Sequence, residues 1–244
     1  MSVERAKIRL FVEQDLAPLQ SVPLDRDHAH YLFNVMRLVA GDRVALFNGR
    51  DGEWTAEIVD AQKKRGIVRC LGQARVQRNP PDLWLLFAPI KKTRTDFIVE
   101  KATELGASRI CPVQSDFTNA ERIRQDRLQA HAVEAAEQCG ETFVPEVTDL
   151  QKLSDMLTNW PDDRDLFFCD EELAEDATAG RPNKARQKAA VLIGPEGGFS
   201  DAERRLISAL PAVKSMSLGP RILRADTAAV AALTLWQALF GDWP

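Results

Sequence analysis

Two glycine- and proline-rich segments in the last quarter of the chain hold the residues best suited to binding a ligand. The first runs from Ile193 to Ser200 with the sequence IGPEGGFS, and the second runs from Leu218 to Ala228 with the sequence LGPRILRADTA. Proline fixes its own backbone and lacks an amide hydrogen, whereas glycine lets a ligand approach the main chain closely. Since an apolar run precedes each segment, we predict that the two turns face each other and form one pocket of main-chain groups.

The familiar phosphate-binding signatures are absent. The chain contains no Gly-x-x-x-x-Gly-Lys-[Ser/Thr], and no Gly-x-Gly-x-x-Gly follows an early strand with an acidic residue about 20 positions later. ATP hydrolysis and dinucleotide redox chemistry therefore lose their main support.

A metal site has little support either. The candidate ligands are few and scattered: Cys70, Cys111, Cys139, Cys169, His28, His30 and His131. No Cys-x-x-Cys pair occurs among them. We expect no bound metal, and we interpret the cysteines as buried free thiols.

The elements that must position the two turns change in kind at Asn79-Pro80-Pro81. Before these prolines, one helix over Asp25–Arg37 interrupts short alternating runs, which are typical of a small barrel. The predicted strands there are Ile8–Val12, Arg43–Phe47, Glu53–Val59 and Gly66–Leu71. We therefore expect an N-terminal β-barrel domain over residues 1–78.

After the prolines, short apolar runs alternate with helical periodicity, which indicates an α/β domain with a parallel sheet over residues 79–244. The predicted strands are Leu83–Phe87, Arg109–Val113, Leu166–Cys169, Ala189–Ile193 and Lys214–Leu218. The predicted helices are Asp96–Leu105, Glu121–Cys139, Leu150–Trp160, Asp201–Leu210 and Ala225–Phe240. Ser200 and Glu203 fit a capping box at the start of one helix. The first glycine turn then lies at the carboxyl end of a strand, where such sheets bind ligands.

Composition is compatible with one or two well-packed domains. The chain has 244 residues, of which 45% are hydrophobic. The charged N-terminus does not resemble a signal peptide, and the longest apolar run, Ala228 to Leu233, is too short to span a bilayer. We expect a soluble, cytoplasmic protein.

The net charge of −4 conceals an uneven distribution. Residues 1–80 hold 13 Lys/Arg against 10 Asp/Glu, and no acidic residue lies between Asp60 and Asp82. Lys63, Lys64 and Arg65 fall in that acid-free segment, as a surface that contacts RNA phosphates would require. A strand edge protected by charge explains the same segment equally well.

At the two turns, a specific family resemblance emerges. Ile193–Ser200 together with Leu218–Ala228 resembles the signature of the SPOUT methyltransferases, and in detail that of the RsmE family. Glu100–Gly106, Glu134–Gly140 and His30–Leu38 resemble further blocks of that family. The resemblance covers nearly the whole chain.

The resemblance implies a PUA-like RNA-binding barrel followed by a SPOUT domain whose last segment forms a trefoil knot. It implies methylation of N3 of a specific uridine in 16S ribosomal RNA, free or in the assembled small subunit, with S-adenosylmethionine as the cofactor. It also implies a homodimer. One feature of the residues agrees: Ala228–Phe240 is apolar around most of its circumference, interrupted only by Thr234 and Gln237. The core of a single chain could bury that helix too.

Cofactor contacts are expected from both turns, mainly through main-chain groups. The predicted residues are Leu192, Ile193, Gly194, Pro195, Glu196, Gly197, Gly198, Leu218, Gly219, Ile222, Leu223, Arg224, Thr227 and Ala228.

Arg224 is the predicted catalytic residue, because a cation at the edge of the pocket would stabilise the anion that develops on uracil. The alternative is a structural salt bridge to Asp226 or Glu196.

RNA contacts are expected from basic residues that match the family's basic sites, that follow a strand end, or that lie in the acid-free segment. They are Arg9, Arg37, Lys63, Lys64, Arg65, Lys91, Lys92 and Arg94. Two departures bear on RNA binding, since Phe117 and Glu141 stand where many family members have arginine.

Two other functions remain compatible with the residues. One is a different SPOUT enzyme, such as a ribose 2′-O-methyltransferase, and the other is a non-catalytic PUA-type RNA-binding protein. The barrel together with Glu134–Gly140 favours the RsmE family over the ribose methylators, and the two intact turns argue against an inert protein.

Overall fold

The computed structural model describes residues 6, 8–119, 122–170 and 185–243. Two compact units make up the chain: Met1–Asn79 with Ala136–Val144, and Pro80–Ala135 with Pro145–Pro244. The observed division therefore lies one residue after the predicted one. The sequence does not predict that Ala136–Val144 belongs to the first unit, because contacts between residues far apart in the chain decide it.

A five-stranded sheet with the order β1-β3-β4-β5-β2 forms the first unit. Its strands are β1 (Arg9–Phe11), β2 (Ser21–Leu24), β3 (Arg43–Phe47), β4 (Glu53–Gln62) and β5 (Arg65–Arg75). Only β1 and β3 are parallel, and register shifts along β4 and β5 bend the pair. Buried side chains such as Leu46, Ile58 and Val68 form the hydrophobic core of this unit. The sheet is the barrel-like element that the sequence predicts.

Strand β2 is the one element of this sheet that the sequence does not predict. It has four residues, includes Pro23 and pairs only with β5 at the edge of the sheet. Proline interrupts the sequence pattern of a strand, yet an edge strand tolerates it because one side of its backbone needs no partner.

The predicted helix over Asp25–Arg37 is present in a modified form. Asp25 caps α1 (Arg26–Ala29) by accepting a hydrogen bond from the His28 amide at 2.8 Å. The chain continues as a π-helical segment, η1 (His30–Val35), and turns away at Arg37, whose φ is 57°. A wider π turn adds a residue to the helical repeat, which a 3.6-residue pattern does not reveal.

A seven-stranded sheet, in which every recorded pairing is parallel, forms the second unit. Its order is β12-β10-β11-β6-β7-β8, with β9 beside β7. The strands are β6 (Asp82–Phe87), β7 (Arg109–Gln114), β8 (Glu146–Val147), β9 (Gln151–Lys152), β10 (Arg164–Cys169), β11 (Lys188–Ile193) and β12 (Val213–Ser215). The five longer strands are those that the sequence predicts. The two-residue strands β8 and β9 are too short to show a period.

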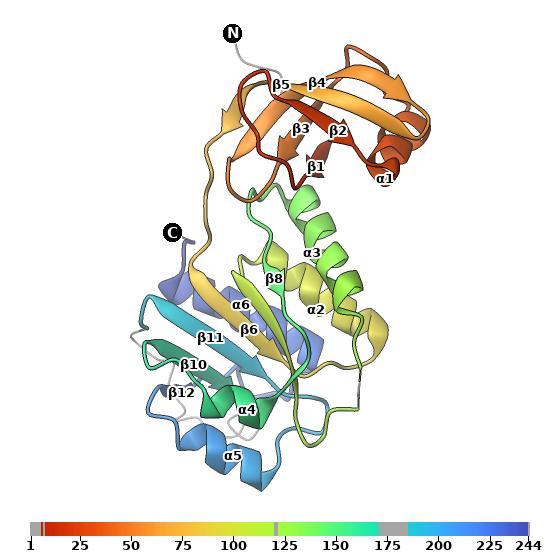
Figure 1. The fold of residues 1–244 in the computed structure, drawn as a ribbon. Coiled ribbons are helices and arrows are strands. Elements are labelled where there is room, and N and C mark those ends of the chain that lie inside the picture. The colour runs from red at the N-terminus through yellow and green to blue at the C-terminus, as the bar shows by residue number, and fades with distance from the viewer. Residues whose placement is uncertain (1–5, 7, 120–121, 171–184, 244) are drawn as a thin grey trace. The chain divides into compact units, whose positions relative to one another are not determined.

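Helices cover both faces of this sheet, as the α/β pattern predicts (Figure 1). They are α2 (Lys92–Glu104), α3 (Gln125–Cys139), α4 (Leu153–Thr158), α5 (Asp201–Ser208) and α6 (Ala225–Phe240). Leu157 of α4 and Ile207 of α5 share one buried cluster with Leu192 of β11. Against the other face, Phe240 of α6 packs on Phe167, with ring centroids 5.6 Å apart. In the described part of the chain, no helix is both long enough and apolar enough to cross a membrane.

Candidate active site

The parallel register brings three strand ends to one edge of the second sheet. Ile193, the last residue of β11, pairs with Cys169 of β10 and with Phe87 of β6. The predicted first turn, Ile193–Ser200, starts at this last strand residue. It therefore leaves the sheet beside Asp170, at the edge where parallel sheets bind their ligands.

Both predicted turns line one cavity of about 200 Å³. Its wall consists of Cys169, Asp170, Ile193, Gly194, Pro195, Glu196, Phe199, Leu218, Gly219, Arg221, Ile222, Leu223, Arg224, Ala225 and Ala228. Apolar side chains predominate, and the charged groups belong to Asp170, Glu196, Arg221 and Arg224. The predicted pairing of the two turns is therefore present in the fold.

Glycine is required at two positions in this wall. A Cβ atom at Gly194 would lie 2.6 Å from Cε2 of Phe199, inside any normal contact distance. The Phe199 ring is buried and packs edge-on against Phe168, with centroids 5.2 Å apart, so it has little room to yield. Gly219 has φ +106°, a conformation that side chains rarely adopt. Both turns thus expose main chain where a side chain would otherwise stand.

Four of the predicted cofactor residues lie outside the cavity wall. Leu192 is fully buried in the cluster with α4 and α5. Gly197 lies beside Phe117, Gly198 closes the turn by donating its amide to the Pro195 carbonyl, and Thr227 is exposed on α6. The other ten predicted residues line the cavity.

Arg224 is exposed at the position that caps α6, and no ion pair to it is recorded among the described residues. Its alternative partners are paired elsewhere. Nη1 of Arg94 lies 2.6 Å from Oε1 of Glu196, and Nε of Arg94 lies 3.6 Å from Oδ2 of Asp226. Arg94 therefore links the glycine turn that follows β11 to the N-terminal end of α6. The Arg224 guanidinium is left available at the edge of the cavity.

Comparison with known proteins shows the family of this chain. Residues 77–237 match the model of an RNA methyltransferase domain, and residues 24–70 match that of an RNA methyltransferase PUA domain. The ribosomal RNA small subunit methyltransferase E of Rickettsia conorii is 31% identical over 92% of this chain and 93% of its own length. This chain belongs to the ribosomal RNA small subunit methyltransferase E family.

Solved structures of methyltransferases have the same fold as this family member. A ribosomal RNA small subunit methyltransferase E from Neisseria gonorrhoeae, bound to S-adenosylmethionine, superposes with a TM-score of 0.88 at 27% identity, covering 97% of this chain and 99% of its own. A protein from Legionella pneumophila, solved with the same cofactor bound, gives a TM-score of 0.86 at 30% identity, covering 98% of this chain and 100% of its own.

Sequence reasoning missed five residues of this family member's cavity: Cys169, Asp170, Phe199, Arg221 and Ala225. Cys169 and Asp170 follow β10, and the sequence gives no sign that β10 is the neighbour of β11. Desolvation raises the pKa of the Cys169 thiol to about 12, so the thiol stays protonated at neutral pH. It contributes an uncharged surface to the cavity wall.

The predicted RNA-binding residues of the second unit divide into two kinds. Lys91 and Lys92 are exposed where α2 begins, whereas Arg94 is half-buried in its ion pairs with Glu196 and Asp226. Arg94 thus binds Glu196, a residue of the cavity wall.

In the first unit, the predicted basic residues other than Arg9 are exposed. Lys63 and Lys64 occupy the turn between β4 and β5, Arg65 is the first residue of β5, and Arg37 follows η1. The Asn34 side chain of η1 donates a hydrogen bond to the Lys63 carbonyl at 3.3 Å. This contact places the basic turn and the end of η1 on neighbouring parts of the surface.

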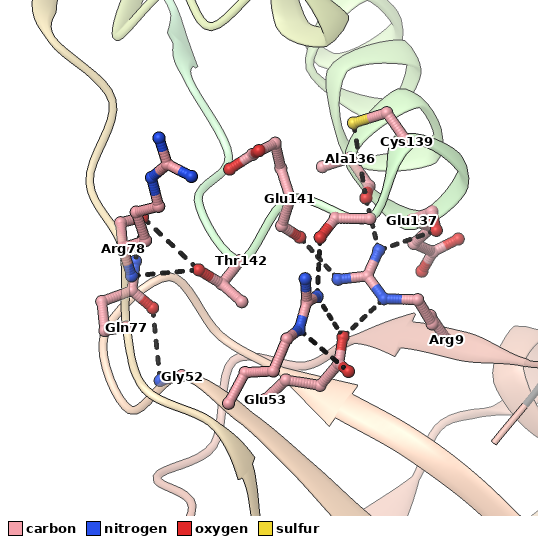
Figure 2. Close-up of polar contacts among 12 residues, drawn as sticks. Arg9, Gly52, Glu53, Gln77, Arg78, Ala136, Glu137, Cys139, Glu141 and Thr142 are labelled. Atoms are coloured by element: carbon pink, nitrogen blue, oxygen red, sulfur yellow. Dashed lines mark hydrogen bonds and ion pairs between the residues drawn. The ribbon is translucent and has the colours of Figure 1, made fainter. Parts of the chain in front are cut away.

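Arg9 lies inside the first unit, where its guanidinium holds the end of α3 (Figure 2). It contacts the Glu53 carboxylate at 2.6 Å and donates to the carbonyls of Ala136 and Glu141, each at 2.6 Å. Its side chain is only 8% exposed. This placement gives a structural role to Arg9 and lends no support to the predicted RNA contact.

Glu53 is the buried centre of that arrangement. Arg75 donates a second charged hydrogen bond to it at 2.6 Å and also reaches the Gly140 carbonyl. Burial alone would raise the pKa of Glu53, but the hydrogen bonds from Arg75 and Arg9 outweigh burial and lower it. The Glu53 carboxylate therefore stays ionised between two arginines that also satisfy carbonyls at the carboxyl end of α3, where cations are favourable.

The two departures from the family pattern have different surroundings. Phe117 is 49% exposed and lies against Gly197 of the first turn. Glu141 offers its main-chain carbonyl to Arg9. The described residues contain no group of three or more His, Cys, Asp or Glu side chains that could hold a metal ion.

Proposed function

We propose that this protein transfers a methyl group from S-adenosylmethionine to N3 of a uridine in the 16S ribosomal RNA of the small subunit. The observation that carries the proposal is the cavity of two glycine turns with Arg224 at its edge, in a chain whose relatives are named for this class of reaction.

The cavity has the composition that this cofactor requires. Ile193, Leu218 and Leu223 supply apolar surface for adenine, while the glycines expose main-chain donors and acceptors for the polar edges of adenine and ribose. When bound, the cofactor supplies a methyl group made electrophilic by the adjoining sulfonium.

The remaining chemistry consists of positioning the base and stabilising charge. Methyl transfer to N3 needs the uracil imide as its anion, and a guanidinium beside the ring stabilises that anion. We assign this role to Arg224, which lines the cavity and is left unpaired because Arg94 binds both neighbouring carboxylates, those of Glu196 and Asp226. Among the lining residues, Cys169 does not compete as a nucleophile, because its thiol is neutral.

The first unit is proposed to hold the RNA. N3 of uridine lies on the Watson–Crick edge, which a duplex hides, so the enzyme must take the base from a loop or extrude it. Phosphate contacts then have to come from outside the cavity. The exposed cations Arg37, Lys63, Lys64 and Arg65 are suited to this.

A homodimer with a knotted C-terminal segment completes the proposal. Support for the dimer comes from α6, in which Ala231, Thr234, Leu235 and Ala238 recur at helical spacing and stay outside the core of the single chain. An apolar stripe of this kind suits a two-fold interface.

Radiolabelled cofactor tests the proposal. Label should pass from S-adenosylmethionine to small-subunit RNA that lacks the modification, and calorimetry should show that the protein binds the cofactor. Raising the salt concentration should weaken RNA binding steeply and leave cofactor binding nearly unchanged. If the protein bound RNA but not the cofactor, the inert RNA-binding alternative would replace this proposal.

A further inference from the structure

A second cavity lies in the second unit beside the first turn of α2. Its volume is about 380 Å³. The lining residues are Pro89, Ile90, Lys92, Thr95, Asp96, Arg122, Ile123, Arg124, Arg127 and Leu128. None of them belongs to the wall of the proposed cofactor cavity.

The lining combines an apolar floor with a cationic rim. Buried Pro89 and Leu128 and half-buried Ile90 and Ile123 supply the floor. Lys92, Arg122 and Arg124 are exposed around it. A flat apolar group attached to an anion matches this combination, and a nucleotide is such a ligand.

Most polar groups of this lining already have partners within the chain. Thr95 exchanges hydrogen bonds with the main chain of Ile90, and Asp96 pairs with Arg127. Asp126 accepts hydrogen bonds from one edge of the Arg124 guanidinium, from Nε at 3.0 Å and from Nη2 at 2.7 Å. For Lys92 and Arg122, no ion pair or hydrogen bond is recorded among the described residues. The charges of these two side chains are therefore fully available to a ligand.

The second cavity adjoins the proposed cofactor cavity across the first turn of α2. Lys92 lines the second cavity, and Arg94, two residues later, extends to Glu196 in the wall of the first. Ile90 follows β6, whose last residue Phe87 is in register with Ile193. Arg94 thus links the start of α2, which carries Lys92, to the wall of the proposed cofactor cavity.

We infer that the second cavity binds the nucleotide next to the target uridine, with its base on Ile90 and Leu128 and its phosphate between Lys92 and Arg122. The inference rests on the proposed RNA substrate and adds a subsite to it. The subsite holds the strand on one side of the target while Arg224 acts on the extruded base.

Direct RNA binding tests the subsite without relying on catalysis. The probe is a labelled single-stranded heptamer with one central uridine, titrated in the presence of S-adenosylmethionine. The Lys92→Ala/Arg122→Ala variant should raise Kd about tenfold and reduce the slope of log Kd against log salt by about 0.7, the value for one phosphate that is no longer neutralised.

A control variant removes the same charge elsewhere in the second unit. Lys152 and Arg205 are exposed and line neither cavity. Lys152→Ala/Arg205→Ala should change Kd by less than about twofold, the effect of a diffuse field alone. Equal losses in both double variants would overturn the subsite, because the effect would then be one of net charge.

Abasic substitutions test the contact with the base. With each position beside the uridine made abasic in turn, one position should cost wild-type affinity, and that cost should vanish in Lys92→Ala/Arg122→Ala. A uniform cost at every position would contradict the assignment. So would displacement of the heptamer by an equal concentration of free uridine 5′-monophosphate, which would indicate a mononucleotide site.

Failure of the proposed function would appear in a different measurement. If the wild-type protein transferred no methyl group, the methyltransferase proposal would fall, while the heptamer titrations would still decide whether the second cavity binds RNA.

Discussion

At the residue scale, the site depends on which of its charged groups are already paired. Arg94 binds Glu196 and Asp226, which leaves Arg224 beside the cavity as a cation without an ion-pair partner among the described residues. A paired guanidinium would be a weak catalyst, because uracil would first have to displace a carboxylate. The division between Arg94 and Arg224 is therefore what gives Arg224 its proposed role.

Replacing Arg224 with alanine should lower kcat by at least about 100-fold, the usual effect of removing one donor from a preorganised anion site. Calorimetry should show that the Kd for S-adenosylmethionine changes by less than about fivefold, because the apolar wall and the main chain remain. Circular dichroism should match the wild-type spectrum. A variant with full turnover would remove Arg224 from the mechanism.

The Cys169 thiol should resist alkylation at neutral pH. With its pKa raised to about 12, about one thiol in ten thousand is ionised at pH 8, and the thiolate is the reactive form. Raising the pH towards 12 increases that fraction, so labelling by iodoacetamide should rise about tenfold per pH unit. Mass spectrometry of the modified peptides measures this, with exposed Cys139 as the internal reference. Labelling of Cys169 ahead of Cys139 at pH 7 would contradict the assigned pKa.

At the element scale, the turn after β11 tolerates no side chain at its first residue. Gly194→Ala would place a Cβ 2.6 Å from the Phe199 ring, which Phe168 holds in place. We expect a loss of about 1–3 kcal/mol in the free energy of unfolding from overpacking, together with weaker cofactor binding. Urea unfolding and calorimetry measure the two effects.

Gly72→Ala provides the matched control, because Gly72 has ordinary φ and no atom within 4 Å of the added Cβ. That variant should keep wild-type stability and cofactor affinity. Equal behaviour of the two variants would show that the Phe199 ring is free to move.

The junction between β1, β4, β5 and the end of α3 depends on an ionised carboxylate. Glu53→Gln should lower the free energy of unfolding at pH 7 by about 3 kcal/mol, because the buried guanidinium of Arg9 and the partly exposed guanidinium of Arg75 would lose their counter-charge. Urea unfolding measures the change, with the exposed Glu13→Gln as the control.

The pH dependence of that difference has a definite sign. Glu53 has its pKa lowered from 4.5 in the folded protein, so its stabilisation is complete above pH 4.5 and is lost as the pH falls through the folded pKa. The gap between wild type and Glu53→Gln should stay constant from pH 7 to pH 5 and shrink below pH 4.5. A gap that widened in acid would contradict the cluster.

The sequence predicts those elements whose pattern is local. The patterns of β3 and β11 can be recognised within a few residues. Ser200 and Glu203 likewise predict the capping box of α5. Strand β2, the π-helical segment and the two-residue strands have no such local pattern. The cavity follows the same rule, because its glycine turns are visible as motifs whereas Cys169 and Asp170 join it only through strand order.

Arg9 shows most clearly why side-chain roles are harder to predict than elements. Its resemblance to a basic site of the family predicts RNA contact, yet its partners are Glu53 and carbonyls more than 120 positions away in the chain. No window of sequence contains that information. Arg94 behaves in the same way, since Glu196 and Asp226 are distant in sequence and adjacent in the fold.

At the scale of the whole molecule, α6 both covers the second sheet and leaves a stripe outside it. Thr234 lies in the middle of that stripe. Thr234→Arg should therefore yield a monomer in light scattering where the wild type is a dimer, because the proposed two-fold interface would bury two like charges. The control is Ala202→Arg on the exposed face of α5, which should leave the mass unchanged. A wild-type protein that is monomeric would contradict the dimer directly.

The central claim is that the two glycine turns and Arg224 direct a methyl group to N3 of a uridine in small-subunit RNA. The most direct test is to incubate the protein and S-adenosylmethionine with small subunits and with naked 16S ribosomal RNA, digest the RNA, and separate the nucleosides by mass spectrometry. We predict that 3-methyluridine appears with the wild-type protein and is strongly reduced with Arg224→Ala. The appearance of 2′-O-methyl nucleosides in its place would contradict the account.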